Sequence, residues 1–138
     1  MIYAFDSNTI SYLLRGEGNV AKYFARVIAQ KGAGYAIPPM AVFEIKRWLL
    51  DKPTKVTRAY LSAFIDLLEP VRDKAAIDTA VWEKAAEIYI ALKQRGQLIG
   101  DVDILIAGYC LENGYELVTR NTGDFKRIDG LIIHNWYD

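Results

Sequence analysis

Short runs of apolar residues alternate with longer amphipathic segments along the whole chain. The first run, residues 1–5, is followed at once by four polar residues, 6–9, of kinds that favour turns and helix caps. Apolar runs of this length are typical of buried strands. The predicted strands are residues 1–5, 35–37, 70–72, 116–119 and 131–133, with 70–72 expected to be only a brief one.

Between the strands, apolar residues recur every three or four positions, as on the buried face of a helix. Residues 19–31 show this clearly, because Val20, Phe24 and Val27 share one face. Residues 104–111 are apolar nearly all round, which predicts a central, buried helix. In chain order, the predicted helices are a short one ending near residue 16, followed by 19–31, 40–50, 54–68, 75–95 and 104–111.

Strands that alternate with helices indicate a parallel sheet covered by helices on both faces. We therefore expect an α/β fold with three layers, α/β/α, around a central and mostly parallel sheet. The length of 138 residues suits one domain, and no linker or repeat divides it. With 52% hydrophobic and 25% charged residues, the composition excludes a disordered chain. No apolar run approaches the ~20 residues that a membrane span requires, so we expect no membrane association.

Composition and charge narrow the classes of function. A single cysteine, Cys110, excludes a disulfide framework and fits a reducing cytoplasm, where we expect the protein to lie. The single histidine, His134, argues against a zinc site built from His and Cys. The 17 basic and 17 acidic residues give zero net charge, which argues against a protein that coats nucleic acid. An enzyme that acts on nucleic acid through locally arranged charge remains open.

Acidic side chains gather where the predicted strands end. In a parallel α/β sheet, functional groups collect outside the carboxyl ends of the strands. Asp6 directly follows the first strand and Asp124 follows the fourth, while Asp101 and Asp103 begin the helix that leads into that fourth strand. Glu44 differs, because it lies inside a predicted helix among apolar neighbours. A carboxylate in such a place needs a partner or a cation.

Each of these acids taken alone has an ordinary structural explanation. The explanations are helix capping by Asp6 or Asp101, a favourable helix-dipole contact of Asp103, an ion pair of Glu44 with Arg47, and a turn closed by Asp124 with residues 121–123. As a group, however, acids at one sheet edge repel strongly unless a cation lies between them. Oxygen ligands without His or Cys select magnesium or manganese over zinc. The group therefore predicts a site for Mg²⁺ or Mn²⁺.

Helix geometry separates Asp101 from Asp103. Residues two positions apart lie about 200° apart around an α-helix, so both cannot face one site. Asp103 stands next to the buried run that starts at Ile104, and it is the better anchored of the two. We predict Asp103 as the ligand and Asp101 as a cap or an outer contact.

The acids stand in motifs that resemble those of a known family. Residues 6–8 (DSN) follow the first strand, Glu44 lies in a helix, and two longer motifs follow at residues 99–107 (IGDVDILIA) and 118–125 (VTRNTGDF). In this order and at this spacing they resemble the PIN domain, and within it the VapC toxins of bacterial and archaeal toxin–antitoxin pairs. The resemblance covers the whole chain, and the last two motifs are its specific part.

The resemblance implies a single PIN-like domain over residues 1–138, with endoribonuclease activity that depends on Mg²⁺ or Mn²⁺. The residues in the family's acidic positions are Asp6, Glu44, Asp103 and Asp124, with Asn8 and Thr119 as polar neighbours that orient ligands or water. The resemblance also implies a cytoplasmic toxin, often a homodimer, that a cognate VapB-type antitoxin silences. Metal ions suit the reaction because they neutralise the phosphate and lower the pKa of bound water. The alternative is a non-catalytic PIN-like module that binds RNA or a partner.

Two positions depart from the family's pattern. Many relatives carry a non-acidic residue in place of Asp101, which adds a metal contact or caps the helix. Gly108 replaces a common alanine, and we expect this change to matter little.

Contacts with the substrate and the partner are predicted from surface composition. Three basic residues near the acids, Lys46, Arg47 and Arg120, are candidates for contacts with RNA phosphates, although an ordinary solvated surface explains them equally well. For the antitoxin we expect a docking face of apolar and aromatic residues. That face comprises Trp48, Leu49, Leu50, Tyr60, Leu61 and Phe64.

Overall fold

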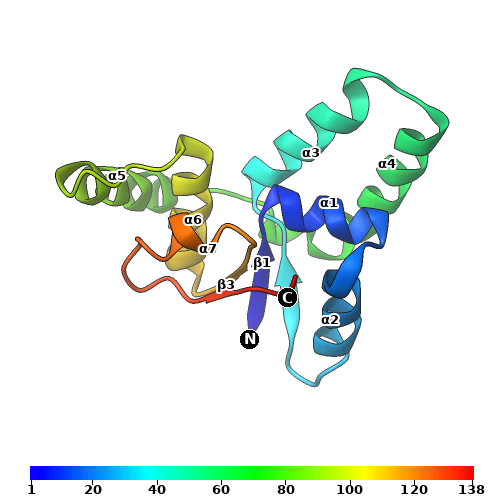
Figure 1. Ribbon diagram of the computed structural model, residues 1–138, viewed down its shortest axis with the longest axis horizontal. Helices are drawn as coiled ribbons and strands as arrows, with labels where there is room; N and C mark the ends of the chain where they lie inside the picture. The colour runs from blue at the N-terminus through cyan, green and yellow to red at the C-terminus, as the bar shows by residue number, and fades with distance from the viewer.

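A four-stranded parallel sheet forms the centre of the molecule (Figure 1). The computed structural model describes residues 1–138. The strand order is β2-β1-β3-β4, so the first strand lies in the interior of the sheet. The strands are β1 (Ile2–Phe5), β2 (Gly34–Ala36), β3 (Glu116–Val118) and β4 (Ile133–His134). Four of the five predicted strands are therefore present.

The register of the sheet brings together two positions that are far apart in the sequence. Phe5 at the end of β1 pairs with Val118 at the end of β3. The next residues, Asp6 and Thr119, therefore leave the sheet side by side at its carboxyl edge. This is the edge at which parallel α/β sheets present functional groups.

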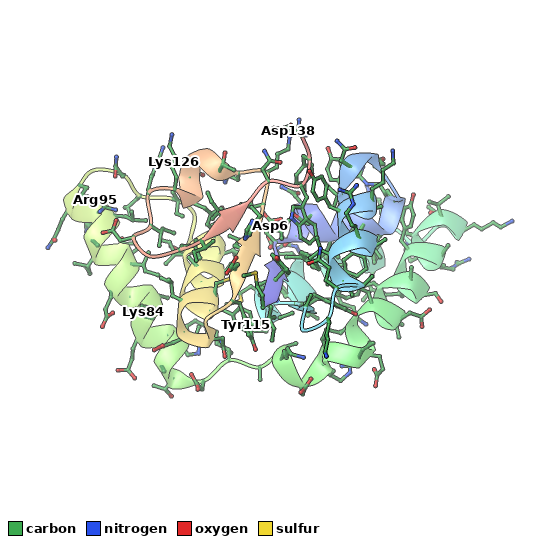
Figure 2. All side chains as sticks on the ribbon, turned by 90° about the horizontal axis from the view of Figure 1, so that it is seen from below. Asp6, Lys84, Arg95, Tyr115, Lys126 and Asp138 are labelled. Atoms are coloured by element: carbon green, nitrogen blue, oxygen red, sulfur yellow. The ribbon has the colours of Figure 1, made fainter.

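Helices cover both faces of the sheet (Figure 1, Figure 2). The helices α1 to α4 pack on one face, and α5 and α6 pack on the other. The predicted three-layer α/β fold is therefore confirmed, with a sheet that is parallel throughout. No helix is both long and apolar enough to cross a membrane. The helices are α1 (Ser7–Arg15), α2 (Gly18–Ile28), α3 (Pro39–Asp51), α4 (Lys55–Leu68), α5 (Thr79–Gln94), α6 (Asp101–Asn113) and α7 (Thr122–Phe125).

Alternate residues of the strands face opposite helical layers, as the pleat of a strand requires. Ala4 and Leu117 pack against α5 and α6 in one core, together with Tyr109. Phe5 and Val118 pack against α1, α3 and α4 in the other core. Both cores extend to the carboxyl edge, so the elements that meet there are held by packing on either side of the sheet.

Residues 70–72, predicted as a brief strand, lie instead in a 3-10 helix, Glu69–Lys74. Pro70 stands in the first turn of this helix, where its fixed φ and missing N–H are tolerated, whereas an interior strand would need that N–H. Val71 is buried in the core beneath α1 to α4. Its apolar character therefore signals burial and not strand pairing.

A local cap explains the helix boundary that differs most from the prediction. The helix expected over residues 75–95 is α5, which begins at Thr79. The Asp78 carboxylate accepts a hydrogen bond from the Val81 amide at 3.3 Å, so the helix starts at this cap. The other helices begin and end within three residues of their predicted bounds.

Gly108 lies at a close approach of α6 to α5. A β-carbon at this position would lie 3.2 Å from both the Ala85 amide nitrogen and the Val81 carbonyl oxygen. Both are backbone atoms of α5, which cannot move aside as a flexible side chain does. The missing side chain therefore allows the two helices to pack closely, and a side chain at this position would require α5 to shift by a few tenths of an ångström.

Candidate active site

Asp6 lies near the middle of the molecule, between the two helical layers (Figure 2). It is the N-cap of α1 and is only 6% exposed. The Thr9 amide donates to its Oδ1 atom at 3.0 Å, and the Thr119 hydroxyl donates to its Oδ2 atom at 2.6 Å. Burial raises the pKa of Asp6 although these hydrogen bonds favour the charged form, and the charge of Glu44 raises it further. Asp6 thus caps the helix and also presents a buried carboxylate at the sheet edge.

Glu44 reaches the same edge from α3. Two prolines start this helix directly after β2, because their fixed φ suits a first turn. Glu44 is half-buried, and the Ser7 hydroxyl at the start of α1 donates a hydrogen bond to its Oε1 atom. The ion pair with Arg47 that would have explained Glu44 is not formed. The Arg47 guanidinium lies instead over the Phe43 ring, 5.0 Å from its centroid.

Asp103 contributes a third carboxylate from the first turn of α6. It is half-buried and lies at the amino-terminal end of α6. Burial contributes most to raising the pKa of Asp103 from 3.8 to about 6, and the negative charges of three neighbouring acids add to the increase. Those neighbours are Asp6, Glu44 and Asp124.

Asp6, Glu44 and Asp103 line one small cavity of about 90 Å³. Its other lining residues are Ser7, Asn8 and Ile106, so no lysine or arginine neutralises the carboxylates within it. No three Asp, Glu, His or Cys side chains are arranged so as to hold a metal ion. The donors are nevertheless carboxylate, hydroxyl and amide oxygens, which is the set that magnesium and manganese prefer. The chemistry of the cavity therefore fits a hard divalent cation.

Asp124 lies outside this cavity, in α7. Asn121 Nδ2 donates to its Oδ2 atom at 3.0 Å. This contact agrees with the structural explanation of Asp124, a turn that it closes with residues 121–123. Arg127 Nη2 lies 3.7 Å from its Oδ1 atom. The charge of Asp124 still acts on Asp103. The structure thus brings three of the four predicted acids into one cavity and leaves the fourth within electrostatic reach.

The three residues predicted to assist the acids differ in their placement. Asp101 is the exposed first residue of α6, and Gly100 takes the cap position before it, so the expected capping role of Asp101 is wrong. Asn8 lines the cavity. Thr119 is fully buried and donates its hydrogen bond to Asp6. Asn8 and Thr119 therefore lie where polar neighbours of the acids were expected.

Ser7 and Thr9 belong to the site although the sequence assigned them no role. Thr9 is fully buried, and its hydroxyl donates to the Val118 carbonyl at 3.1 Å, which ties α1 to the end of β3. Its amide contact with Asp6 follows from its place three residues after a helix cap, a signal that local sequence carries. The contact of Ser7 with Glu44 joins residues 37 positions apart, and no local pattern reveals it.

The single cysteine and the single histidine lie away from the cavity. Cys110 is fully buried in α6, and burial raises the pKa of its thiol. His134 Nε2 on β4 lies 2.6 Å from Glu116 Oε1 on β3. Neither side chain lines the cavity, so no Ser–His or Cys–His pair supplies a nucleophile there.

None of the three basic candidates lines the cavity. Lys46 is half-buried and Arg47 is exposed on α3, beyond Glu44. Arg120 is exposed and directly follows Thr119. Each of them can reach a ligand at the cavity only from outside it.

The predicted docking face is partly wrong. Leu49 and Phe64 are 2% and 0% exposed and belong to the core, so neither is available to a partner. Trp48 and Leu50 are exposed, and the Trp48 ring lies 6.1 Å from that of Tyr60. The exposed large apolar side chains of α3 and α4 are Phe43, Trp48, Leu50, Val56 and Ile65. The apolar surface of these helices therefore differs from the predicted face in its residues.

Comparison with known proteins places the chain in a family. A family model described as the PIN domain matches residues 3–131. Ribonuclease VapC2 of Rickettsia felis is 30% identical over 137 residues, which cover 99% of this chain and 98% of that protein. The tRNA(fMet)-specific endonuclease VapC of Shigella flexneri is 31% identical over 78 residues, which cover 56% of each chain. The crystal structure of VapBC2 from Rickettsia felis, bound to a DNA fragment from its promoter, contains a chain that matches with a TM-score of 0.82 and 26% identity, over 99% of both chains.

The matched regions contain the cavity. Residues 3–131 include every residue that lines it, and also Asp124. Because the family model and a relative of the same length both extend over nearly the whole chain, the protein belongs to the PIN domain family.

Proposed function

We propose that this protein is a metal-dependent endoribonuclease that acts as the toxin of a toxin–antitoxin pair. The observation that carries the proposal is the cavity in which Asp6, Glu44 and Asp103 meet without a positive partner. The negative charges of the neighbouring acids raise the pKa of Asp6 and of Asp103, so these carboxylates need a cation in order to be charged together. The names of the relatives, a ribonuclease and a tRNA endonuclease, support RNA as the substrate.

Asp6, Glu44 and Asp103 would hold Mg²⁺ or Mn²⁺, with Asp124 as the fourth acid of the site. When bound, such an ion neutralises the carboxylates and the substrate phosphate and lowers the pKa of water. The carboxylates would bind the ion at the sheet edge. The cavity contains no lysine or arginine, so no positive side chain would compete with the ion for the carboxylates.

Hydrogen bonds within the chain set the directions of the carboxylates. Thr9 and Thr119 hold the two oxygens of Asp6 at the end of β1. Ser7 holds Glu44 and so joins the start of α1 to α3. Such outer contacts restrict the rotation of ligands and keep a site in its productive arrangement. Water is the proposed attacking group, because no side-chain nucleophile with a partnering histidine lies at the cavity.

The partners belong to the same proposal. We include a VapB-type antitoxin, because the related solved structure is of a complex named VapBC2. The RNA phosphates would contact Lys46, Arg47 and Arg120, which lie on the segments that also carry Glu44 and Thr119. A homodimer and a cytoplasmic location complete the proposal, as the family resemblance implies.

The test is RNA cleavage by the purified full-length chain. A panel that contains tRNA and unstructured RNA is incubated with Mg²⁺, with Mn²⁺ or with EDTA. We expect cleavage only when metal is present, loss of cleavage with EDTA, and recovery when metal is added in excess. An RNA panel that is bound but stays intact at every metal concentration would overturn the proposal in favour of the non-catalytic module.

A further inference from the structure

Basic and aromatic side chains gather beside the cavity, and the proposed function uses only one of them. We call this group the basic–aromatic strip; its members are Tyr12 and Arg15 of α1, Arg120 after β3, and Tyr137 near the carboxyl terminus. Arg120 Nη1 donates to the Tyr12 hydroxyl at 3.2 Å, and its guanidinium lies 5.5 Å from the centroid of the Tyr137 ring. The Arg15 guanidinium lies 5.0 Å from the Tyr12 ring. The two tyrosine rings meet edge to face at 4.8 Å.

Two members of the strip connect to Asp6, which lines the cavity. Arg120 directly follows Thr119, whose hydroxyl donates to Asp6. The Tyr137 hydroxyl is hydrogen-bonded to the Thr9 hydroxyl at 3.0 Å, and the Thr9 amide donates to Asp6. Arg120 and Tyr137 are thus each linked to the buried carboxylate through one buried threonine.

The helix α1 continues the strip away from the cavity. Asn8 lines the cavity, and Tyr12 and Arg15 follow it four and seven residues later. Positions with this spacing share one face of a helix. A polymer bound at the cavity therefore meets the strip as it leaves along this face.

The positive charge of the strip is largely available to a ligand. Arg120 is exposed, and its polar contact is with the neutral Tyr12 hydroxyl. Arg15 lies 3.7 Å from Glu17 in an exposed pair, which is a weak kind of contact. The aromatic rings support both guanidinium groups and restrict their motion before any ligand arrives.

Other cation–aromatic contacts in the chain are isolated pairs. They are Arg26 with Tyr23 on α2, Arg47 with Phe43 on α3, and Lys93 with Tyr89 on α5. The strip differs from them because it joins two arginines and two tyrosines next to a buried carboxylate. We therefore consider the strip as a binding surface because of its position, since cation–aromatic contacts also occur elsewhere in the chain.

We propose that the basic–aromatic strip binds the unpaired nucleotides of the RNA that adjoin the phosphate to be cut. The inference rests on the proposed function and assigns to it the surface that holds the RNA next to the cut. Guanidinium groups bind phosphates in a bidentate manner, and their planes and the tyrosine rings stack on bases. Bases in a duplex stay stacked on one another, so only unpaired bases can use such a surface.

The experiment measures RNA binding separately from cleavage. The anisotropy of a fluorescent single-stranded RNA is recorded with the full chain carrying Asp103→Asn, so that the RNA stays intact. Arg120→Ala on this background is compared with Arg26→Ala, which removes an arginine that lies over the Tyr23 ring of α2. We expect Arg120→Ala to raise Kd about tenfold and to reduce the slope of log Kd against log salt by about 0.7, whereas Arg26→Ala changes neither.

Two further measurements separate stacking from charge. Arg120→Lys keeps the charge and loses the planar group, so we expect an unchanged salt slope and a Kd about threefold higher. Arg120→Lys also provides a folded variant should Arg120→Ala fail to fold. With duplex RNA of the same length, we expect Arg120→Ala to have a smaller effect on Kd than with the single strand.

The outcomes distinguish this inference from the proposed function. Equal Kd values for the folded Arg120→Ala and Arg26→Ala proteins would overturn the inference. The strip would then be a candidate surface for binding a protein partner. If the parent chain never cleaves RNA but Arg120→Ala still weakens binding tenfold, the proposed function fails while the strip stands as an RNA-binding surface.

Discussion

Two of the hollows that acidic side chains line differ in size, burial and compensating charge. The first is the cavity of about 90 Å³ at the carboxyl edge of the sheet, which contains Asp6. The second has a volume of about 560 Å³ and includes Tyr115, just before β3, at the opposite edge (Tyr115 and Asp6 are both marked in Figure 2). Its acids are Asp73, Asp78 and Glu112, and all three are exposed.

Burial and charge, and not size, are the reasons why we propose the smaller hollow as the functional one. In the larger one, water reaches the carboxylates, Lys74 supplies a positive charge, and Asp78 serves as the cap of α5. In the smaller one, no basic side chain is present, and burial with like-charge repulsion raises the pKa of Asp103 to about 6. Carboxylates without a positive neighbour in such a place need a cation in order to be charged together.

The largest expected difference between the hollows is in activity. Asp103→Asn is expected to lower the rate of RNA cleavage at least about 100-fold. Loss of a residue that only orients a metal ligand costs about 10- to 100-fold in activity, and loss of the ligand itself should cost at least as much. Asp73→Asn, in the larger hollow, is expected to keep the rate within about twofold. Initial rates on one RNA at saturating Mg²⁺ measure both. Equal rates for the parent and Asp103→Asn would refute the assignment of the cavity.

Metal binding is expected to distinguish the hollows by stability. A divalent ion that binds only the folded chain stabilises it by about 2.7 kcal/mol at a concentration one hundred times Kd. We expect Mg²⁺ or Mn²⁺ to raise the melting temperature of the parent and of Asp73→Asn, but not that of Asp103→Asn. Scanning calorimetry with and without EDTA measures the shift. A shift that Asp73→Asn abolishes and Asp103→Asn preserves would place the ion in the larger hollow.

The packing of α6 on α5 affects both hollows, because α6 runs from Asp103 at one to Glu112 at the other. Gly108→Ala is expected to lower the free energy of unfolding by about 1 kcal/mol, since overpacking against the α5 backbone outweighs the better helix propensity of alanine. Gly123→Ala is the control, because a β-carbon there meets nothing within 4 Å. Urea titration compares the two. A more stable Gly108→Ala protein would show that α5 yields at this contact.

The smallest expected effect is on the pH dependence of stability without metal. Between pH 3.8 and about 6, folded Asp103 keeps a proton that the unfolded chain releases. Its contribution to stability is therefore present at low pH and is lost as pH rises through this range. We expect the melting temperature of the parent to fall relative to Asp103→Asn from pH 4 to pH 6. A difference that does not change over this range would contradict the raised pKa.

The positions of two acids could be predicted because they depend on the alternation of strands and helices. Asp6 follows a strand, and Asp103 begins the buried helix that leads to the next strand, so a parallel sheet brings both to one edge. The exposed position of Asp101 also agrees with helix geometry, whereas its predicted capping role is wrong. The neighbouring Gly100 takes the cap, and a choice between adjacent residues depends on backbone angles that spacing does not reveal.

Two other predictions failed because short apolar patterns do not show which neighbour buries them. The brief strand at residues 70–72 is a 3-10 helix whose Val71 packs into a core. Leu49 and Phe64 were expected on a docking face but turn into the same core. Apolar residues surround α3 on several sides, so only the packed structure shows which of its faces remains exposed.

By itself, the sequence determined the three-layer architecture, the motifs of the PIN domain and the acids at the strand ends, because these depend on residues close together in the chain. Only the tertiary structure decided that Ser7 holds Glu44 and that Arg120 rests on Tyr137. Each of these contacts joins two separate parts of the chain. They follow from the packing of helices and loops around one sheet edge, which no local pattern encodes.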